Sequence, residues 1–332
     1  MDKNQKYLLL EKIDKGYFSN VYKSRNYESG KLVALKQIYV VDNVEKCKNI
    51  VKEIMILKNL DNKNIIQYIG CFEKLKKLYL VMEFIPWNLR NLMNNCYDKN
   101  FIMMGKKLFK DILNGLDYIN NCKLIHCDLK PENILIGEEF IARIGDFGQT
   151  IIDNDDEKSP NVGTRWYKSI ELLLGSKNYT NSVDIWSFGC ILSEWYRRYP
   201  IFNGLTDLEQ IYQIVEKCGV PNIKDYPDWE NLPDVKKLSF TKIDEKNKLE
   251  SELEHIPCDV RDVIKVMLVI NPSKRITTSE LFSMKYFLED TSNFEGCNSF
   301  KKLIMEKEKN LKNNGWKKII LSPCIDLKKF II

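Results

Sequence analysis

The order of structural patterns along the chain constrains its fold more strongly than any other feature. Residues 7–84 favour short strands around one helix, whereas the residues beyond Pro86 favour helices. The segments 31–38 and 77–83 are rich in the β-branched and aromatic residues typical of strands. The helix between them is marked by apolar residues at helical spacing: Ile50, Ile54, Leu57 and Leu60. We therefore predict an α+β fold of two lobes, a small β-rich lobe with one key helix and a larger, mainly helical lobe.

Length and composition agree with this prediction. A single hydrophobic core stops growing at roughly 250–300 residues, and the chain has 332. Residues 185–195 are apolar nearly all round, which predicts a helix buried on several sides. The content of 44% apolar and 29% charged residues is that of a soluble globular protein.

Charge and cysteine usage exclude several classes of function. The net charge is +5, and residues 301–332 alone carry nine Lys and three acidic residues, so the rest of the chain is nearly neutral. We expect no direct binding of nucleic acid from so modest a charge. No apolar run reaches the ~18 residues of a membrane helix, and no signal-peptide pattern is visible, so we expect no membrane contact and an intracellular location. The ten Cys contain no CxxC pair, which argues against a zinc site.

The most specific motif is the segment 126–133, His-Cys-Asp-Leu-Lys-Pro-Glu-Asn, followed thirteen residues later by Asp-Phe-Gly at 146–148. Transfer of a phosphoryl group from ATP to a hydroxyl needs a carboxylate that orients the hydroxyl and accepts its proton. It also needs oxygen ligands that hold Mg²⁺ on the phosphates, and a cation that spreads the developing charge. The motif contains a residue type for each of these tasks.

We assign the roles accordingly. Asp128 suits the catalytic carboxylate, and Lys130 suits the cation. Asn133 and Asp146 suit the metal ligands, and Asn133 also belongs to the catalytic loop. The alternative, an ordinary loop with a few acidic residues, is disfavoured because the loop and the triplet occur together at the expected distance.

From residue 7 to residue 287 the chain resembles a eukaryotic protein kinase, with a small lobe at 7–85, a large lobe at 86–287 and a Lys-rich tail at 288–332. The resemblance implies that Lys36 binds the α- and β-phosphates and that Glu53 is its partner. It also implies that Glu171 pairs with Arg275 and that Asp184 anchors the catalytic loop. Lys130, two residues beyond Asp128, corresponds to the serine/threonine type of the family.

The resemblance also implies an ATP site in the cleft between the lobes. Met82 would be the gatekeeper beside the adenine. The remaining residues of the ATP site are assigned by position, with apolar residues covering the ring and Glu83 and Ile85 offering backbone bonds: Ile13, Gly16, Val21, Lys36, Glu53, Glu83 and Ile85.

Further segments resemble the cyclin-dependent kinases. Residues 163–167, Gly-Thr-Arg-Trp-Tyr, and residues 229–233, Trp-Glu-Asn-Leu-Pro, match that group, and the helix Lys48–Leu60 lies where its members bind a cyclin. The segments 18–23 and 284–287 resemble the CDK-activating kinase of the transcription factor TFIIH. The cell-cycle-related kinase subtype is the alternative, because residues 237–240 fit it as well.

Two departures from the family pattern concern ATP and phosphate binding. The phosphate loop, GxGxxG in the family, keeps only Gly16 here and adds Asp14, so we expect weaker ATP binding. Three basic residues clamp a phosphate on the activation segment of the relatives, and here Cys127 and Ile151 replace two of them, which leaves Lys52. The activation segment contains Ser159, Thr164 and Glu171, and Ser159 lies at the usual phosphorylation site. We predict that activity does not depend on a phosphate there, because a phosphate needs cationic partners to order a loop.

Gly163 is a third informative position. The relatives hold this residue in a left-handed conformation that shapes a pocket for proline after the target residue, and glycine adopts that conformation readily. The resemblance therefore implies a cyclin-dependent kinase that phosphorylates Ser/Thr-Pro sites with ATP and Mg²⁺, with roles in the cell cycle and RNA polymerase II transcription and a nuclear location. The alternatives are a catalytically weak kinase-fold scaffold and a small-molecule phosphotransferase.

Overall fold

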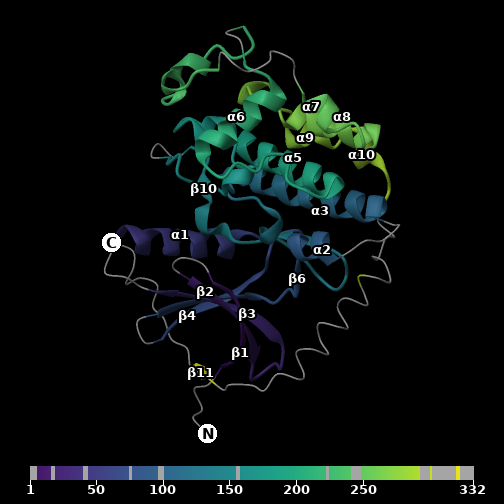
Figure 1. Ribbon diagram of the computed structural model, residues 1–332. Coiled ribbons are helices and arrows are strands. Elements are labelled where there is room, and N and C mark those ends of the chain that lie inside the picture. Colours follow the sequence, from purple (N-terminus) through teal and green to yellow (C-terminus); the bar gives the residue numbers. More distant parts are fainter. Residues whose placement is uncertain are drawn as a thin grey trace.

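The computed structural model describes residues 6–15, 19–39, 44–74, 77–95, 101–154, 158–221, 224–240, 248–291, 300 and 319–321. Figure 1 shows two lobes, a small one built around a β-sheet and a larger helical one. The predicted α+β architecture of a β-rich small lobe and a mainly helical large lobe is therefore confirmed.

The small lobe is built on an antiparallel sheet with the strand order β11-β1-β2-β3-β5-β4. One face carries a compact apolar cluster in which the rings of Tyr7, Phe72 and Tyr79 stack. Because side chains alternate along a strand, Leu35 enters this cluster while Lys36 faces the opposite side. The strands are β1 (Tyr7–Lys15), β2 (Ser19–Asn26), β3 (Leu32–Tyr39), β4 (Tyr68–Lys74), β5 (Lys77–Glu83) and β11 (Ile319–Leu321).

Helix α1 (Val44–Asn59) is the key helix of the small lobe. Ile54 and Leu57 are almost fully buried and belong to the same core cluster as the interior of the large lobe. Glu53, on the adjacent part of the helix, is also buried and approaches Lys36 of β3. Figure 1 shows α1 running between the sheet and the large lobe, so the helix connects the two lobes through both apolar and charged contacts.

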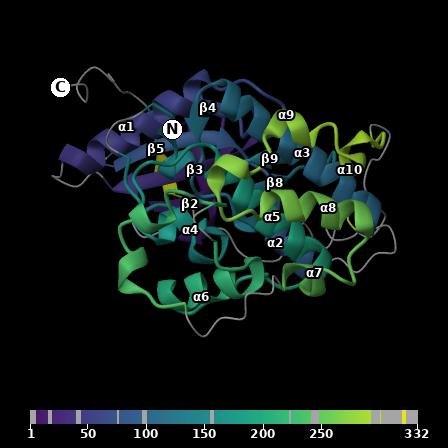
Figure 2. The ribbon, with the colours of Figure 1, turned by 90° about the horizontal axis from the view of Figure 1, so that it is seen from above.

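The large lobe is assembled around α3 (Phe101–Asn121) and α5 (Ser182–Arg197). Nearly all of α5 is buried, including Trp186 and Trp195, as the apolar character of residues 185–195 predicts. Figure 2 shows α5 near the middle of this lobe and α6 at its periphery. The other α-helices are α2 (Leu89–Asn95), α4 (Ile170–Leu173), α6 (Asp207–Cys218), α7 (Leu249–Glu252), α8 (Cys258–Met267), α9 (Thr278–Leu281) and α10 (Lys285–Leu288).

Short strands and turns carry the residues of the predicted site. Strand β7 pairs with β10, and the strands β6, β8 and β9 form a second small sheet. The strands are β6 (Trp87–Asn88), β7 (Leu124–Ile125), β8 (Ile134–Ile136), β9 (Ala142–Ile144) and β10 (Ile151–Ile152). The 3-10 turns are η1 (Pro131–Asn133), η2 (Phe147–Gln149), η3 (Arg165–Tyr167), η4 (Trp229–Asn231), η5 (Val235–Lys237) and η6 (Pro272–Lys274).

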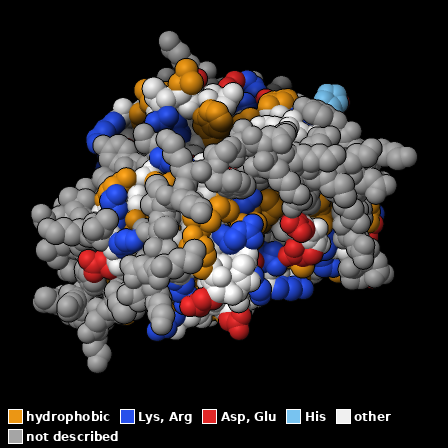
Figure 3. All heavy atoms as spheres, turned by 90° about the horizontal axis from the view of Figure 1, so that it is seen from below, with side chains coloured by type: hydrophobic (Ala, Val, Ile, Leu, Met, Phe, Trp, Pro, Cys, Tyr) orange, Lys and Arg blue, Asp and Glu red, His pale blue; other side chains and the backbone are white. Residues whose placement is uncertain are grey.

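Two described parts of the tail contact the body of the protein. Phe300 is fully buried, and its ring lies 5.0 Å from that of Phe140 and 6.3 Å from that of Trp87. Strand β11 pairs with the β1 edge of the small-lobe sheet. On the face of the molecule in Figure 3, the described Lys and Arg side chains lie among acidic and apolar ones. Within the described ranges, no helix has both the length and the apolar character needed to cross a membrane.

A buried ion pair ties the end of the activation segment to the large lobe. The Arg275 guanidinium donates to both carboxylate oxygens of Glu171, at 2.6 and 2.7 Å, and both side chains are almost fully buried. Arg275 also donates to the carbonyls of Val269, Ser182 and Ile270. The partnership expected for Glu171 and Arg275 is thus formed in the structure, and it fixes α4 against α5 and η6.

We expect Glu171→Gln to lower the free energy of unfolding by about 3 kcal/mol, because it leaves the buried Arg275 charge without its counter-ion. The exposed pair Lys248–Glu216, with an N–O distance of 3.1 Å, provides the control. Glu216→Gln is expected to change stability by less than about 1 kcal/mol. Urea denaturation of both variants measures the difference, and equal losses would contradict a special role for the buried pair.

Candidate active site

The backbone of the catalytic loop is held by one buried carboxylate. Asp184, near the start of α5, accepts hydrogen bonds from the backbone N–H groups of His126 (2.7 Å) and Cys127 (2.9 Å). Cys127 has a left-handed backbone, with φ of 66°, a conformation that few residues other than glycine adopt. The two hydrogen bonds stabilise that unusual turn, which directs the next residue, Asp128, into the cleft.

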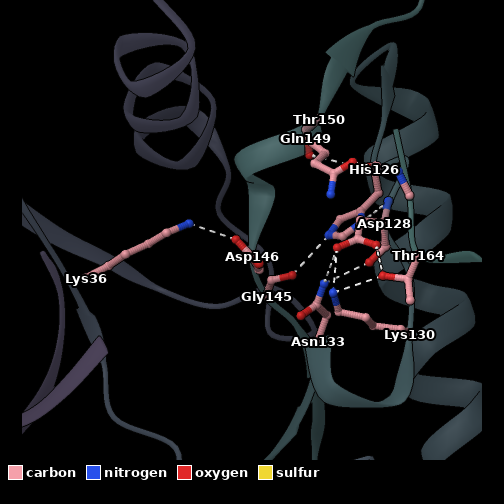
Figure 4. A network of polar contacts seen from close by, with 11 residues as sticks. Lys36, His126, Asp128, Lys130, Asn133, Gly145, Asp146, Gln149, Thr150 and Thr164 are labelled. Atoms are coloured by element: carbon pink, nitrogen blue, oxygen red, sulfur yellow. Dashed lines mark hydrogen bonds and ion pairs between the residues drawn. The ribbon is translucent and has the colours of Figure 1, made fainter. Parts of the chain in front are cut away.

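Figure 4 shows the group of side chains that surrounds Asp128. Lys130 donates to one carboxylate oxygen at 2.8 Å, and the Thr164 hydroxyl donates to the other at 2.7 Å. The Asn133 amide donates to the Asp128 carbonyl at 2.8 Å. Lys130 also donates to the Thr164 hydroxyl at 3.1 Å. The structure therefore brings the three predicted catalytic residues together and adds a residue of the activation segment to them.

A second group joins the two lobes. The Lys36 ammonium lies 2.6 Å from Glu53 of α1 and 2.8 Å from Asp146. Burial opposes the positive charge of Lys36, but the two carboxylates outweigh this effect and raise the pKa of Lys36 above its ordinary value. The Lys36 ammonium in turn lowers the pKa of Asp146 to about 2. Lys36 and Asp146 are therefore both charged at neutral pH, whereas burial raises the pKa of Glu53 against the lowering effect of Lys36.

The turn at 146–148 is fixed by packing. Asp146 has φ of 57°, and Phe147 is almost fully buried with its ring edge-on to His126 at 5.1 Å. The His126 imidazole also bridges the two motifs, since its Nε2 bonds to the Gly145 carbonyl at 3.0 Å and its Nδ1 accepts from the Asp128 amide at 3.3 Å. One side chain thus sets the distance between the turn and the catalytic loop.

The donor set fits a hard divalent cation on a nucleotide. Asp146 offers a carboxylate and Asn133 an amide oxygen, and Figure 4 shows the Asn133 side chain beside Asp128. A Cβ on Gly148 would lie 3.4 Å from both Asp146 Oδ1 and Lys36 Nζ, so the side-chain-free position keeps this space open. Among the described residues, no cluster of three or more His, Cys, Asp or Glu could hold a metal by itself. A bound cation would neutralise phosphate charge during transfer.

Most of the residues predicted around the adenine lie on the strands β1, β2, β3 and β5 of the small lobe, and Ile85 follows β5. Val21 on β2 pairs in register with Lys36 on β3, and Ile13 at the end of β1 exposes 43% of its surface. Met82 and Ile85 are half-buried against the core, and the Glu83 amide donates to the Gln67 carbonyl at 3.0 Å. Gly16 and the rest of the predicted phosphate loop at 16–18 lie outside the described residues.

The activation segment follows an ordered path beyond residue 158. Lys158 donates to the Tyr179 carbonyl at 2.7 Å, and the Tyr179 hydroxyl donates to the Ser159 carbonyl at 2.8 Å. The Ser159 side chain itself is exposed and accepts from the Asn161 amide at 3.2 Å. Further along, Arg165 donates to the Leu205 carbonyl at 2.9 Å.

An apolar cluster occupies the place of the phosphate clamp. Cys127 is buried, and the half-buried Ile151 and Val162 pack on the cluster to which it belongs, whose other members are Ile125, Leu172, Tyr179 and Val183. Burial, and after it the Asp184 charge, raises the pKa of the Cys127 thiol. Two of the three positions that are basic in the relatives thus contribute apolar contacts to the activation segment.

Sequence reasoning missed several residues of this region. The Gln149 side chain accepts a hydrogen bond from the Gly163 amide, and Lys158 and Tyr179 hold the segment around Ser159. The Tyr167 hydroxyl donates to Glu194 at 2.6 Å and accepts from Arg90 at 2.5 Å. Tyr167 ends the motif at 163–167, but Gln149, Lys158, Tyr179 and Arg90 belong to no short motif, so only spatial proximity identifies their contacts.

Comparison with known proteins agrees with this geometry. The family model described as protein kinase domain matches residues 7–287. This chain belongs to the protein kinase family. A curated relative, the serine/threonine-protein kinase ppk23 of Schizosaccharomyces pombe, is 30% identical over 288 residues, which cover 85% of this chain and 72% of the relative. The enzyme is accordingly a serine/threonine protein kinase, and a protein kinase domain implies the use of ATP and a divalent metal ion.

A solved kinase structure is also similar to this chain in fold and sequence. In the crystal structure of the yeast RNA Pol II CTD kinase CTDK-1 complex, one chain matches this kinase with a TM-score of 0.76 and 27% identity, over 85% of this chain and 93% of the solved one. Both similarities are consistent with the predicted resemblance to the cyclin-dependent kinases.

The geometry is compatible with the predicted tasks in phosphoryl transfer. Asp128 would orient the acceptor hydroxyl and receive its proton, and Lys130, which lies beside it, would stabilise negative charge on the transferred group. Lys36 is held by Glu53 for contact with the nucleotide phosphates. Asn133 and Asp146 would hold the metal ion.

We expect Asp128→Asn to lower kcat for peptide phosphorylation by about 10²–10⁴-fold, because the amide cannot accept the proton of the hydroxyl. Nucleotide affinity should change little, since Lys36 and Asp146 remain in place. Initial rates and titration with a fluorescent ATP analogue measure the two quantities. Glu138→Gln, on an exposed turn of the same lobe, serves as the control and should retain full activity. A kcat within tenfold of the parent enzyme would exclude Asp128 as the base.

Proposed function

We propose that this kinase phosphorylates serine or threonine residues that are followed by proline, with ATP and Mg²⁺ as phosphoryl donor and metal. The observation that carries the proposal is the backbone of Gly163, with φ of +83°. A Cβ there would approach the Cys127 carbonyl oxygen to 2.8 Å, so only glycine fits this conformation and position. The loop therefore takes the left-handed form that the resemblance associates with a pocket for proline.

A cyclin-like subunit is the proposed activating partner, and it would bind the helix Lys48–Leu60. Within α1, Met55 exposes half of its surface, while its neighbours Ile54 and Leu57 are buried. An exposed Met offers an adaptable apolar contact to a partner. The solved relative CTDK-1 was crystallised as a complex, which supports the idea that this kinase also works in an assembly. Side chains of residues 44–49 lie outside the described residues.

The proposed setting is cell-cycle control and RNA polymerase II transcription in the nucleus. The similarity to a kinase of the polymerase tail and the short segments that resemble the TFIIH-associated CDK-activating kinase support it. The cell-cycle-related kinase subtype remains the competing assignment. The two subtypes differ in substrate. The CDK-activating kinase subtype would act on polymerase tails and on other kinases, so the preferred peptide distinguishes the two.

The alternative of an inactive scaffold is disfavoured by the assembled cleft. Lys36 pairs with Glu53 and Asp146 at hydrogen-bond distance, and Asp128 points toward Thr164 on the substrate side. A small-molecule phosphotransferase is disfavoured by the ordered activation segment and its Glu171–Arg275 anchor. Both features would be unnecessary for an enzyme that binds no protein substrate.

We also propose that activation-segment phosphorylation is dispensable. Ser159 is exposed, its backbone is held by Tyr179, and the position of the usual arginine is the buried Cys127. The apolar cluster and the Lys158 ammonium supply the contacts that a clamped phosphate supplies in relatives. In the sequence, Ser159 follows the acidic stretch 153–157 closely, and these negative charges would disfavour a phosphate there.

We expect the kinase co-purified with its partner to phosphorylate a polymerase-tail repeat peptide. Replacing the proline after the target serine by alanine should lower kcat/KM about tenfold or more, because one shaped contact is lost. The isolated chain should be much less active than the complex. A CDK activation-segment peptide tests the other substrate class, and Asp128→Asn provides the blank. Equal rates with the proline and alanine peptides would refute the proposed specificity.

For the activation segment, we expect Ser159→Ala to keep activity within about twofold, whereas Tyr179→Phe should lower it about 2- to 10-fold by removing one hydrogen bond to the Ser159 carbonyl. Tyr199→Phe, at a side chain that is 57% exposed, is the matched control. Rates with and without phosphatase treatment complete the test. If the Ser159→Ala variant were inactive while the phosphorylated parent enzyme was fully active, the phosphate would be required.

A further inference from the structure

Gln149 links the metal-binding turn to the loop that would receive the substrate. It directly follows the Asp-Phe-Gly triplet, and its side-chain oxygen accepts a hydrogen bond from the Gly163 amide at 2.6 Å. The two residues are fourteen positions apart in the sequence. Figure 4 shows the Gln149 side chain extending from the end of the turn toward the group around Asp128 and Thr164.

The backbone beneath Gln149 is rigid. Phe147 before it and Thr150 after it are both almost fully buried. The Thr150 amide donates to the Phe147 carbonyl at 3.1 Å, and the Thr150 hydroxyl donates to the His126 carbonyl at 3.5 Å. The Gln149 side chain is exposed, but it therefore starts from a fixed point on the catalytic loop and the metal turn.

Gly163 itself needs an external constraint. Glycine populates many backbone conformations, so it does not maintain φ of +83° by its own sterics. The Cys127 carbonyl limits its position from one side, and the Gln149 amide oxygen fixes its N–H from the other. The following residue, Thr164, bonds to the catalytic Asp128. The placement of Gly163 therefore decides where a substrate residue would lie relative to Asp128.

We propose that Gln149 is a positioning residue that holds Gly163 in the left-handed conformation and thereby sustains the preference for proline after the target residue. The specificity part of this inference rests on the proposed function, whereas the hold on Gly163 does not. Gln149 would act through the loop and not on the reacting atoms. It also makes the shape of the substrate loop depend on the conformation of the turn that carries Asp146.

Three variants test this proposal in the partner-bound enzyme. Gln149→Met keeps the length of the side chain but removes the acceptor, whereas Gln149→Glu keeps an acceptor oxygen. Gln213→Met is the matched control, because Gln213 accepts a similar bond from the Asn203 amide at 2.9 Å away from the cleft. The readouts are the ratio of kcat/KM between proline and alanine peptides, the ATP KM, and hydrogen–deuterium exchange over residues 161–165. The ratio compares two peptides on the same enzyme. An effect of the added charge in Gln149→Glu that is common to both peptides therefore does not change the ratio.

We expect Gln149→Met to lower the proline-to-alanine ratio about 2- to 10-fold and to speed exchange at Gly163 by a similar factor, as the loss of one hydrogen bond implies. The ATP KM should change less than twofold, and both Gln149→Glu and Gln213→Met should resemble the parent enzyme in ratio and exchange. An unchanged ratio and unchanged exchange in Gln149→Met would overturn the proposal, as would faster exchange without a change in the ratio. A parent enzyme without a proline preference would refute the proposed function instead, and the exchange data would still decide whether Gln149 holds the loop.

Discussion

The Lys36 ammonium lies between two carboxylates that belong to different parts of the molecule, Glu53 on the helix of the small lobe and Asp146 at the metal turn of the large lobe. A buried lysine is stable as a cation only with such partners, so the three groups hold one another in place. The position of α1, the direction of β3 and the conformation of the turn at 146–148 all depend on this arrangement. It also explains why a partner protein bound to α1 could control activity, because a shift of α1 would move Glu53 away from the lysine.

A second set of contacts fixes the catalytic loop and the activation segment to the large lobe. Asp184 holds the backbone of the catalytic loop from inside α5, and His126 spans the distance between Asp128 and Gly145. The Glu171–Arg275 pair fixes the far end of the activation segment. Between these anchors, the segment is held by apolar packing on Cys127 and by Lys158 and Tyr179. Two positions that are basic in the relatives, Cys127 and Ile151, therefore contribute apolar packing in this kinase.

The fold was predicted correctly, and the predicted catalytic residues lie close together in the structure, because both depend on patterns of neighbouring residues. The change from strand-like to helical patterns indicated two lobes, and residues 126–133 and 146–148 contain the catalytic and metal-binding side chains in a fixed order. The side chains of Asp128, Lys130 and Asn133 meet because six consecutive residues of one tight loop carry all three. The partners Lys36 and Glu53 required the family resemblance, since nothing in their spacing alone places them at 2.6 Å.

The sequence by itself determined the two-lobe architecture and the catalytic loop, because periodicity and short motifs are properties of neighbouring residues. Only the tertiary structure decided that Gln149 bonds to Gly163, that Tyr179 holds Ser159, that Cys127 packs among Ile151 and Val162, and that Phe300 of the tail lies against Phe140. Each of these contacts joins residues that are far apart in the chain and have ordinary side chains. Whether such residues meet depends on how the helices and strands pack, and that packing is a property of the whole fold.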